Sequence, residues 1–211
     1  MNPCHDSDLR LVRACQDPDS DAFDAAFEAL YGRYRDRVYS IAYRITGSAT
    51  HAMDVMQESF CLLFRKIESF RSDARFSTWL FRLVVNCSID HMRHERARGG
   101  GRAVELSQAE APADPLHGPR ERAESRELGD HVQRAIGRLS PKLRAVLVLR
   151  YLEGQSYEEL SQTLDVSMGT VKSRLARAHL ALEKQLRGTL EVFGIPEDAD
   201  EDALDRSEGA A

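Results

Sequence analysis

The sequence has few of the features that mark secreted, membrane-bound or metal-binding proteins. Its four cysteines (positions 4, 15, 61 and 87) include no CxxC pair, so they indicate reduced thiols rather than a disulfide framework or a zinc site. No apolar run approaches the roughly 20 residues that a membrane-spanning helix needs. The first residues, MNPCHDSDL, lack the basic and apolar segments of a signal peptide. We therefore expect a cytoplasmic protein with no membrane insertion.

Motifs for catalysis are also missing. The 211 residues contain no paired catalytic constellation, no Gly-rich phosphate loop and no metal-ligand spacing. We predict that the protein is not an enzyme, with no catalytic residues, no cofactor and no metal site. Strand patterns are scarce too. The apolar run at 145–149 is the one candidate, and its flanking cap and stop signals favour a buried helix.

The net charge of −5 argues at first against a nucleic-acid partner. The last 15 residues, 197–211, hold seven acidic residues and one arginine, a net charge of −6. Residues 1–196 therefore carry a net charge of +1, and basic faces can exist on them. We expect the acidic tail to be disordered. It either solubilises the protein or competes with DNA for the basic faces.

Apolar residues recur every three or four positions through most of the chain, which predicts an all-α protein. The expected helices cover residues 9–15, 21–47, 51–69, 78–96, 120–136 and 141–154, followed by two more before residue 190. Residues 98–119 interrupt this pattern with four glycines and three prolines, which is typical of a linker. We predict two helical domains, 1–97 and 120–190, joined by a flexible linker (98–119) and followed by an acidic tail (191–211).

The stretch from Ser156 to Arg187 predicts a helix-turn-helix in the C-terminal domain. Ser156 and Glu159 have the spacing of a capping box, and Ser167 can cap a second helix after a short turn. The second helix would turn polar and basic residues outward, where they could contact phosphates or base edges. These residues are Thr170, Lys172, Ser173, Arg174 and Arg177. The alternative is an amphipathic hairpin with a solvated basic face.

Two separated blocks resemble one family, the bacterial RNA polymerase sigma factors of the sigma-70 family, in the extracytoplasmic-function (ECF) subfamily. Residues 54–98 carry a D-x-x-Q-x-x-F pattern at Asp54, Gln57 and Phe60, followed by a TWL pattern from Thr78. Residues 139–178 include the run GTVKSR. Ser167 departs from the family, which often has proline there, but serine also caps a helix.

The resemblance implies that the N-terminal domain recognises and melts the promoter −10 element, and that the helix-turn-helix recognises the −35 element. The loop at 70–77 would capture an unstacked base, with Asn86 within reach and basic residues on nearby phosphates. The implied −10 and melting residues are Phe70, Arg71, Ser72, Asp73, Phe76, Asn86, Arg93 and Arg96. Asn86 could instead be a plain surface residue, and the basic helix end could simply suit a helix C-terminus.

The resemblance also implies partners. Core RNA polymerase would bind a polar face of the helix at 51–69, and the residues implied are Asp54, Gln57, Glu58 and Phe60. The alternative for that face is ordinary solvation. Promoter DNA is the second partner, and an anti-sigma factor is the third. A one-component helix-turn-helix transcription regulator is the competing function, but it leaves the match of residues 54–98 unexplained.

Overall fold

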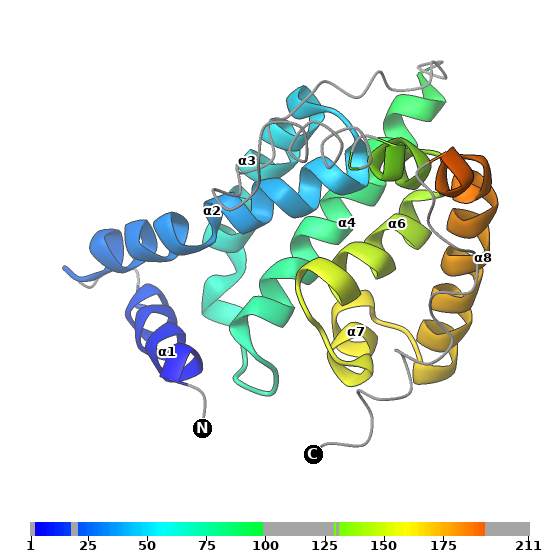
Figure 1. The fold of residues 1–211 in the computed structure, drawn as a ribbon. Coiled ribbons are helices and arrows are strands. Elements are labelled where there is room, and N and C mark those ends of the chain that lie inside the picture. The colour runs from blue at the N-terminus through cyan, green and yellow to red at the C-terminus, as the bar shows by residue number, and fades with distance from the viewer. Residues whose placement is uncertain (1–2, 18–20, 99–128, 130, 193–211) are drawn as a thin grey trace, which may run out of the picture.

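The computed structural model describes residues 3–17, 21–98, 129 and 131–192, and every regular element in these ranges is helical (Figure 1). The all-α prediction is therefore confirmed. The predicted linker beyond residue 98 and the acidic tail beyond residue 192 lie outside the described residues. None of the described helices is both long and apolar enough to cross a membrane. The elements are α1 Pro3–Cys15, α2 Phe23–Thr46, α3 Ala49–Lys66, η1 Ile67–Ser69, α4 Phe76–Ala97, α6 Pro141–Leu147, η2 Val148–Leu152, α7 Tyr157–Leu164 and α8 Met168–Val192, with residues 131–137 also helical.

Helices α2, α3 and α4 form the N-terminal bundle, and most of the apolar residues that recur every three or four positions along them are buried in it, among them Leu30, Val55 and Leu80. Gly47 ends α2 in the left-handed region at φ 75°, which glycine adopts without steric cost. Ser48 then caps α3 by accepting a hydrogen bond from the backbone N–H of His51 at 3.4 Å. The turn between α2 and α3 thus follows from two adjacent residues.

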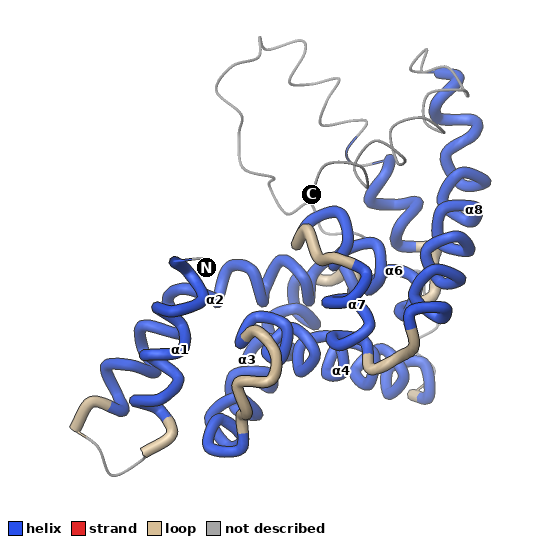
Figure 2. The backbone as a smooth tube through the Cα atoms, turned by 90° about the horizontal axis from the view of Figure 1, so that it is seen from below, coloured by secondary structure: helices blue, strands red, loops and turns tan. Residues whose placement is uncertain are grey.

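Helix α1 begins earlier than the expected start at residue 9, at Pro3. It is tied to α2 through Asp8, which is buried. The hydroxyl of Tyr34 donates to one Asp8 oxygen at 2.6 Å, and the guanidinium of Arg33 donates to the other. Because both carboxylate oxygens have donors, burial of this charge is compensated. In Figures 1 and 2, α1 and α8 lie at opposite edges of the molecule.

The expected helix at 141–154 is present but changes its winding halfway. After Leu147 it widens into η2, where the N–H of Glu153 reaches back five residues to the carbonyl of Val148. The wider turn shifts the side chains that follow, so Tyr151 is 53% exposed instead of facing the core as the periodicity predicted. Its hydroxyl lies 2.7 Å from Nε2 of His179 on α8.

The C-terminal helices pack directly on the N-terminal bundle: α6 contacts α2 and α4, and α7 contacts α4. Arg144 of α6 is the central polar contact, and its guanidinium is buried. It donates to the carbonyl of Ile45 at 2.7 Å, near the C-terminal end of α2, and to the carbonyls of Gly137 and Leu139 in its own half. Burial, together with repulsion from Arg96, lowers the pKa of Arg144 to about 10, so the side chain remains charged at neutral pH.

We expect Arg144→Lys to lower the free energy of unfolding by roughly 2–3 kcal/mol, because three different guanidinium nitrogens donate to the three carbonyls, and a single ammonium nitrogen cannot lie within hydrogen-bond distance of all of them. Urea titration followed by circular dichroism and by Trp79 fluorescence measures this. Arg187→Lys is the control, since the Arg187–Glu183 pair is exposed and within one helix, and it should cost under about 0.5 kcal/mol. Equal losses of unfolding free energy in the Arg144 and Arg187 variants would contradict a stabilising role for the buried Arg144 contacts.

Candidate nucleic-acid interface

The helix-turn-helix is built largely by local hydrogen bonds. The predicted capping box is confirmed: Ser156 accepts from the N–H of Glu159 at 3.2 Å, and Glu159 accepts from the N–H of Ser156 at 2.9 Å. Asp165 ends α7 at φ 53°, a conformation that Asp tolerates better than most side chains. The hydroxyl of Ser161 donates to the carbonyl of Val166 at 2.6 Å and holds the turn together.

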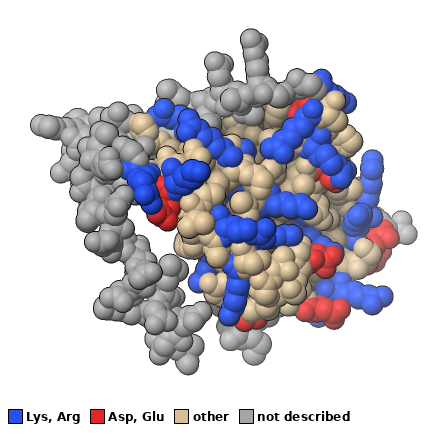
Figure 3. Space-filling model, turned by 90° about the vertical axis from the view of Figure 1, so that its right-hand side faces the viewer, with Lys and Arg blue, Asp and Glu red and all other residues tan. Residues whose placement is uncertain are grey.

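Helix α8 begins as predicted at the Ser167 cap, which accepts from the N–H of Thr170 at 3.2 Å. Val171, Leu175 and Ala178 are buried on its inner face. Among the predicted DNA-contacting residues, Lys172, Ser173 and Arg177 are exposed, whereas Thr170 and Arg174 are half-buried. Lys and Arg side chains predominate on this side of the molecule (Figure 3).

Charge at the start of α7 is arranged to suit a helix N-terminus. The pKa of Glu158 lies below its usual value, because its carboxylate accepts hydrogen bonds from its own N–H and from Ser156; Lys172 contributes a weaker attraction. Lys172 also lies over the ring of Tyr157, with its Nζ 5.8 Å from the ring centroid. These contacts orient the first basic side chain of α8.

The loop at 70–77 rests on aromatic side chains. Phe70 and Phe76 are buried, and their ring centroids lie 5.2 and 6.0 Å from that of Trp79. Gln16 holds the start of the loop by donating to the carbonyl of Phe70 at 2.9 Å. The two phenylalanines therefore support the loop from below, and its exposed residues are Arg71, Ser72, Asp73 and Arg75.

Three further predicted residues lie along α4. Asn86, Arg93 and Arg96 are all exposed. Asn86 lies ten residues beyond Phe76, which is about 15 Å along the helix axis at 1.5 Å per residue. Arg93 forms an ion pair with Asp90 one turn earlier, at 3.1 Å. The predicted −10 residues therefore extend well beyond the loop.

The predicted polymerase-binding residues divide into two groups. Asp54, Gln57 and Glu58 are exposed on α3, but Phe60 is buried and packs against Tyr31 with ring centroids 4.7 Å apart. Phe64, one turn further along α3, is 54% exposed and contacts the rings of Phe23 and Phe27. It was missed by the sequence reading, although it is an aromatic residue outside the inward period of its helix.

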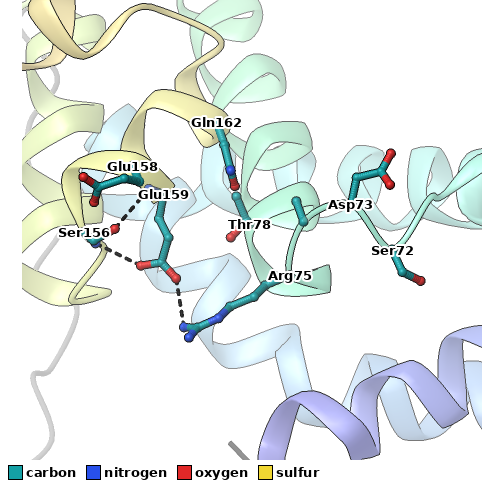
Figure 4. Close-up of a pocket in the computed structure, with 9 residues that line it drawn as sticks. Ser72, Asp73, Arg75, Thr78, Ser156, Glu158, Glu159 and Gln162 are labelled. Atoms are coloured by element: carbon teal, nitrogen blue, oxygen red, sulfur yellow. Dashed lines mark hydrogen bonds and ion pairs between the residues drawn. The ribbon is translucent and has the colours of Figure 1, made fainter. Parts of the chain in front are cut away.

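A groove of about 590 Å³ separates the 70–77 loop from α7. Ser72, Asp73 and Thr78 line one side, and Glu158 and Gln162 line the other. Arg75 crosses the groove to Glu159, with an N–O distance of 2.8 Å (Figure 4). The predicted base-reading loop therefore lies next to the first helix of the helix-turn-helix.

Comparisons with known proteins identify two regions. Residues 30–98 match the family model of sigma-70 region 2, and residues 130–182 match that of sigma-70 region 4. The ECF RNA polymerase sigma factor SigW of Bacillus subtilis is 34% identical over 168 residues, which cover 77% of this chain and 89% of that protein. The ECF RNA polymerase sigma-E factor of Salmonella typhimurium is 34% identical over 186 residues, covering 86% and 95%.

A solved structure has the same fold. The sigma factor RpoE of Bartonella quintana, in complex with the anti-sigma factor NepR, is similar with a TM-score of 0.59 at 23% identity. The similarity covers 76% of this chain and 96% of that chain.

We expect Ser156→Ala to destabilise the protein by roughly 1 kcal/mol, because the side-chain cap of α7 is lost. Ser140→Ala is the matched control, since Ser140 precedes α6 without a side-chain cap hydrogen bond, and its effect should stay within about 0.5 kcal/mol. Thermal unfolding of both variants measures the difference. A larger loss at Ser140 than at Ser156 would show that the capping box contributes little.

Proposed function

This chain belongs to the sigma-70 family of bacterial RNA polymerase sigma factors, in the ECF subfamily, and we propose that it binds core RNA polymerase and directs it to promoters through two separate DNA contacts. The observation that carries the proposal is the occurrence of both sigma regions in one chain, in order. A one-component regulator would need only the second region, so it is not favoured.

Region 4 recognises the −35 element in this proposal. Support comes from the basic exposed side of α8 and from the positions of Lys172, Arg174 and Arg177 in its first three turns. An α-helix fits the major groove, where Arg can bind guanine in bidentate fashion. Thr170 and Ser173 would add shorter polar contacts.

Region 2 recognises and opens the −10 element. The 70–77 loop offers a surface of Arg71, Ser72 and Asp73 on a rigid aromatic base, which suits capture of one unstacked base. Asn86, Arg93 and Arg96 would follow the same strand along α4.

Core polymerase binds the exposed face of α3. Support comes from its mixture of polar groups (Asp54, Gln57 and Glu58) with the exposed aromatic ring of Phe64, a combination common at interfaces. Phe60 acts beneath this face, where its ring fixes Tyr31. Sigma factors are not enzymes, and we propose that this chain has no catalytic activity and acts in the cytoplasm, where polymerase is.

An anti-sigma factor is a third proposed partner. The related fold of RpoE from Bartonella quintana was solved with the anti-sigma factor NepR. Such a partner would cover the exposed apolar side chains that polymerase otherwise uses, among them Met53 and Phe64.

Asp54→Arg combined with Gln57→Ala should abolish co-elution with core polymerase, because the variant places a positive charge in the proposed contact. Glu183→Arg on α8 is the control and should bind as the unaltered protein does. Circular dichroism should be the same for all three proteins. Co-elution of the double variant at undiminished affinity would rule out this face.

Lys172→Ala and Arg174→Ala should each weaken binding of the holoenzyme to a −35 duplex. If the lost side chain contacts a base, binding should weaken by roughly 1–3 kcal/mol and the sequence preference at that position should relax. If it contacts a phosphate, the slope of log affinity against log salt concentration should fall by about one for every sequence. Lys184→Ala, three turns further along α8, is the control. If affinity and salt slope stay unchanged in both variants, α8 is not the recognition helix.

A further inference from the structure

Among the residues that the structure describes, three ion pairs join the two halves, and in each one the arginine comes from the N-terminal half. All three carboxylates belong to a short segment of the C-terminal half, residues 153–165. The pairs are Arg37 with Glu153, Arg75 with Glu159 and Arg82 with Asp165, with N–O distances of 2.5, 2.8 and 2.6 Å. The segment that carries these acids includes α7 and its flanking turns.

The arginines themselves remain accessible. Their side chains are 42–56% exposed, so water and salt reach each guanidinium. Exposed ion pairs of this kind contribute little to stability and are screened by salt. The carboxylates of Glu159 and Asp165 can therefore be displaced by another anion at low cost, whereas that of Glu153, whose side chain is 7% exposed, leaves its arginine only when the two halves separate.

Two of these arginines continue a row of side chains already assigned to DNA. Arg75, at the N-terminus of α4, is followed on the same face by Arg82, Asn86 and Arg93, at spacings of seven, four and seven residues. The row is about 27 Å long at 1.5 Å per residue. Helix α7 packs against α4 and carries Glu159, the partner of Arg75, and Asp165 directly after α7 is the partner of Arg82, whereas Asn86 and Arg93 are exposed.

This arrangement cannot contact both promoter elements at once. The element names count base pairs from the transcription start, so the −35 and −10 elements lie about 25 base pairs apart, roughly 85 Å at 3.4 Å per pair. Here the 70–77 loop and α7 line the same groove. Simultaneous recognition of the two elements therefore requires the two halves to separate, and separation removes the carboxylate partners of Arg37, Arg75 and Arg82.

We propose that Arg37, Arg75 and Arg82 form a phosphate-binding surface for the melted promoter strand, and that Glu153, Glu159 and Asp165 occupy this surface in the closed molecule as substitutes for phosphates. A guanidinium binds carboxylate and phosphate oxygens with the same donor fork. Closure of the two halves and binding of single-stranded DNA are thus mutually exclusive. This inference rests on the proposed function, because it assigns a further part of the same DNA interface.

The test uses conservative variants of the full chain. In the first variant, Glu153→Gln, Glu159→Gln and Asp165→Asn remove the three negative charges. Glutamine keeps an acceptor for the capping box at position 159, and asparagine tolerates the left-handed conformation at position 165. The matched control removes three exposed negative charges elsewhere, through Glu28→Gln, Asp36→Asn and Glu183→Gln.

Separation of the halves can be followed by energy transfer between dyes on Cys61 and on Leu180→Cys, both on exposed positions of different halves. Cys4→Ser removes one competing thiol. Burial raises the pKa of Cys15 to about 11 and that of Cys87 above its usual value, so these two thiols react poorly. We expect lower energy transfer in the neutralised variant than in the control variant. In the protein with unaltered carboxylates, we expect energy transfer to fall when oligothymidylate is added.

Binding of labelled oligothymidylate is then measured by anisotropy over a range of salt concentrations. The neutralised variant should bind roughly threefold or more tightly than the control variant, since each exposed pair contributes only weakly to closure. A variant that combines Arg37→Gln, Arg75→Gln and Arg82→Gln tests the arginines. The slope of its log affinity against log salt concentration should be smaller by about two, because each phosphate contact on a single strand contributes about 0.7.

The decisive comparison combines the two sets of changes. In the variant that already carries the three arginine-to-glutamine substitutions, neutralising the carboxylates should alter the affinity for oligothymidylate no more than the control substitutions do. The proposal would be overturned if neutralising the carboxylates raised the affinity as much without the three arginines as with them. It would also be overturned if the neutralised and control variants had equal affinities and equal energy transfer. These assays use the free chain, so failure to bind core polymerase would refute the proposed function without deciding this result.

Discussion

The buried guanidinium of Arg144 is the contact on which the arrangement of the two halves depends. The last carbonyls of a helix have no partner within it, and α2 ends against the C-terminal half, where water cannot satisfy them. Arg144 donates to one of these, the carbonyl of Ile45, and also to two carbonyls next to α6. A positive charge at this end of α2 also suits the helix dipole. Because α6 is fixed in this way, η2, α7 and α8 follow in defined positions against the N-terminal bundle.

Two kinds of contact therefore hold the halves together, and they respond differently to salt and to competing anions. Around Arg144 the contact is buried: α6 places Ala145 and Val146 in the shared core, and η2 places Leu149 there. At the rim, the arginine–carboxylate pairs are open to solvent, apart from Glu153, whose side chain is 7% exposed. Salt and competing anions act on the rim and hardly on the centre. A molecule built this way can loosen at the exposed ion pairs before its buried contact breaks.

In the proposed function, helices α3 and α8 each pack one face in the core and use the exposed face for binding. Helix α3 buries Val55, Phe60 and Leu63 and exposes a polar face that carries Asp54 and Gln57. Helix α8 buries Val171 and Leu175 under its basic face. The 70–77 loop is built in the same way, because Phe70 and Phe76 are held in the core while the polar residues Arg71, Ser72, Asp73 and Arg75 are exposed. Recognition by this protein thus depends on surfaces whose geometry is set by the packing directly beneath them.

By itself, the sequence determined the local structure: the helix ends at Gly47 and Ser167, the capping box of Ser156 and Glu159, and the inward faces of α2, α3, α4 and α8. Those features depend on residues a few positions apart, and spacing along the chain reveals them. Tertiary structure decided the rest. Arg144 looks like any surface cation of an amphipathic helix, and Arg37 lies 116 residues from its partner Glu153. That Tyr151 turns outward after the wide turn of η2, and that the exposed ring of Phe64 contacts Phe23 and Phe27, likewise followed only from how the helices pack. Such contacts form between segments that are far apart in the sequence. The periodicity within one segment does not predict which residues of the other segment it will contact.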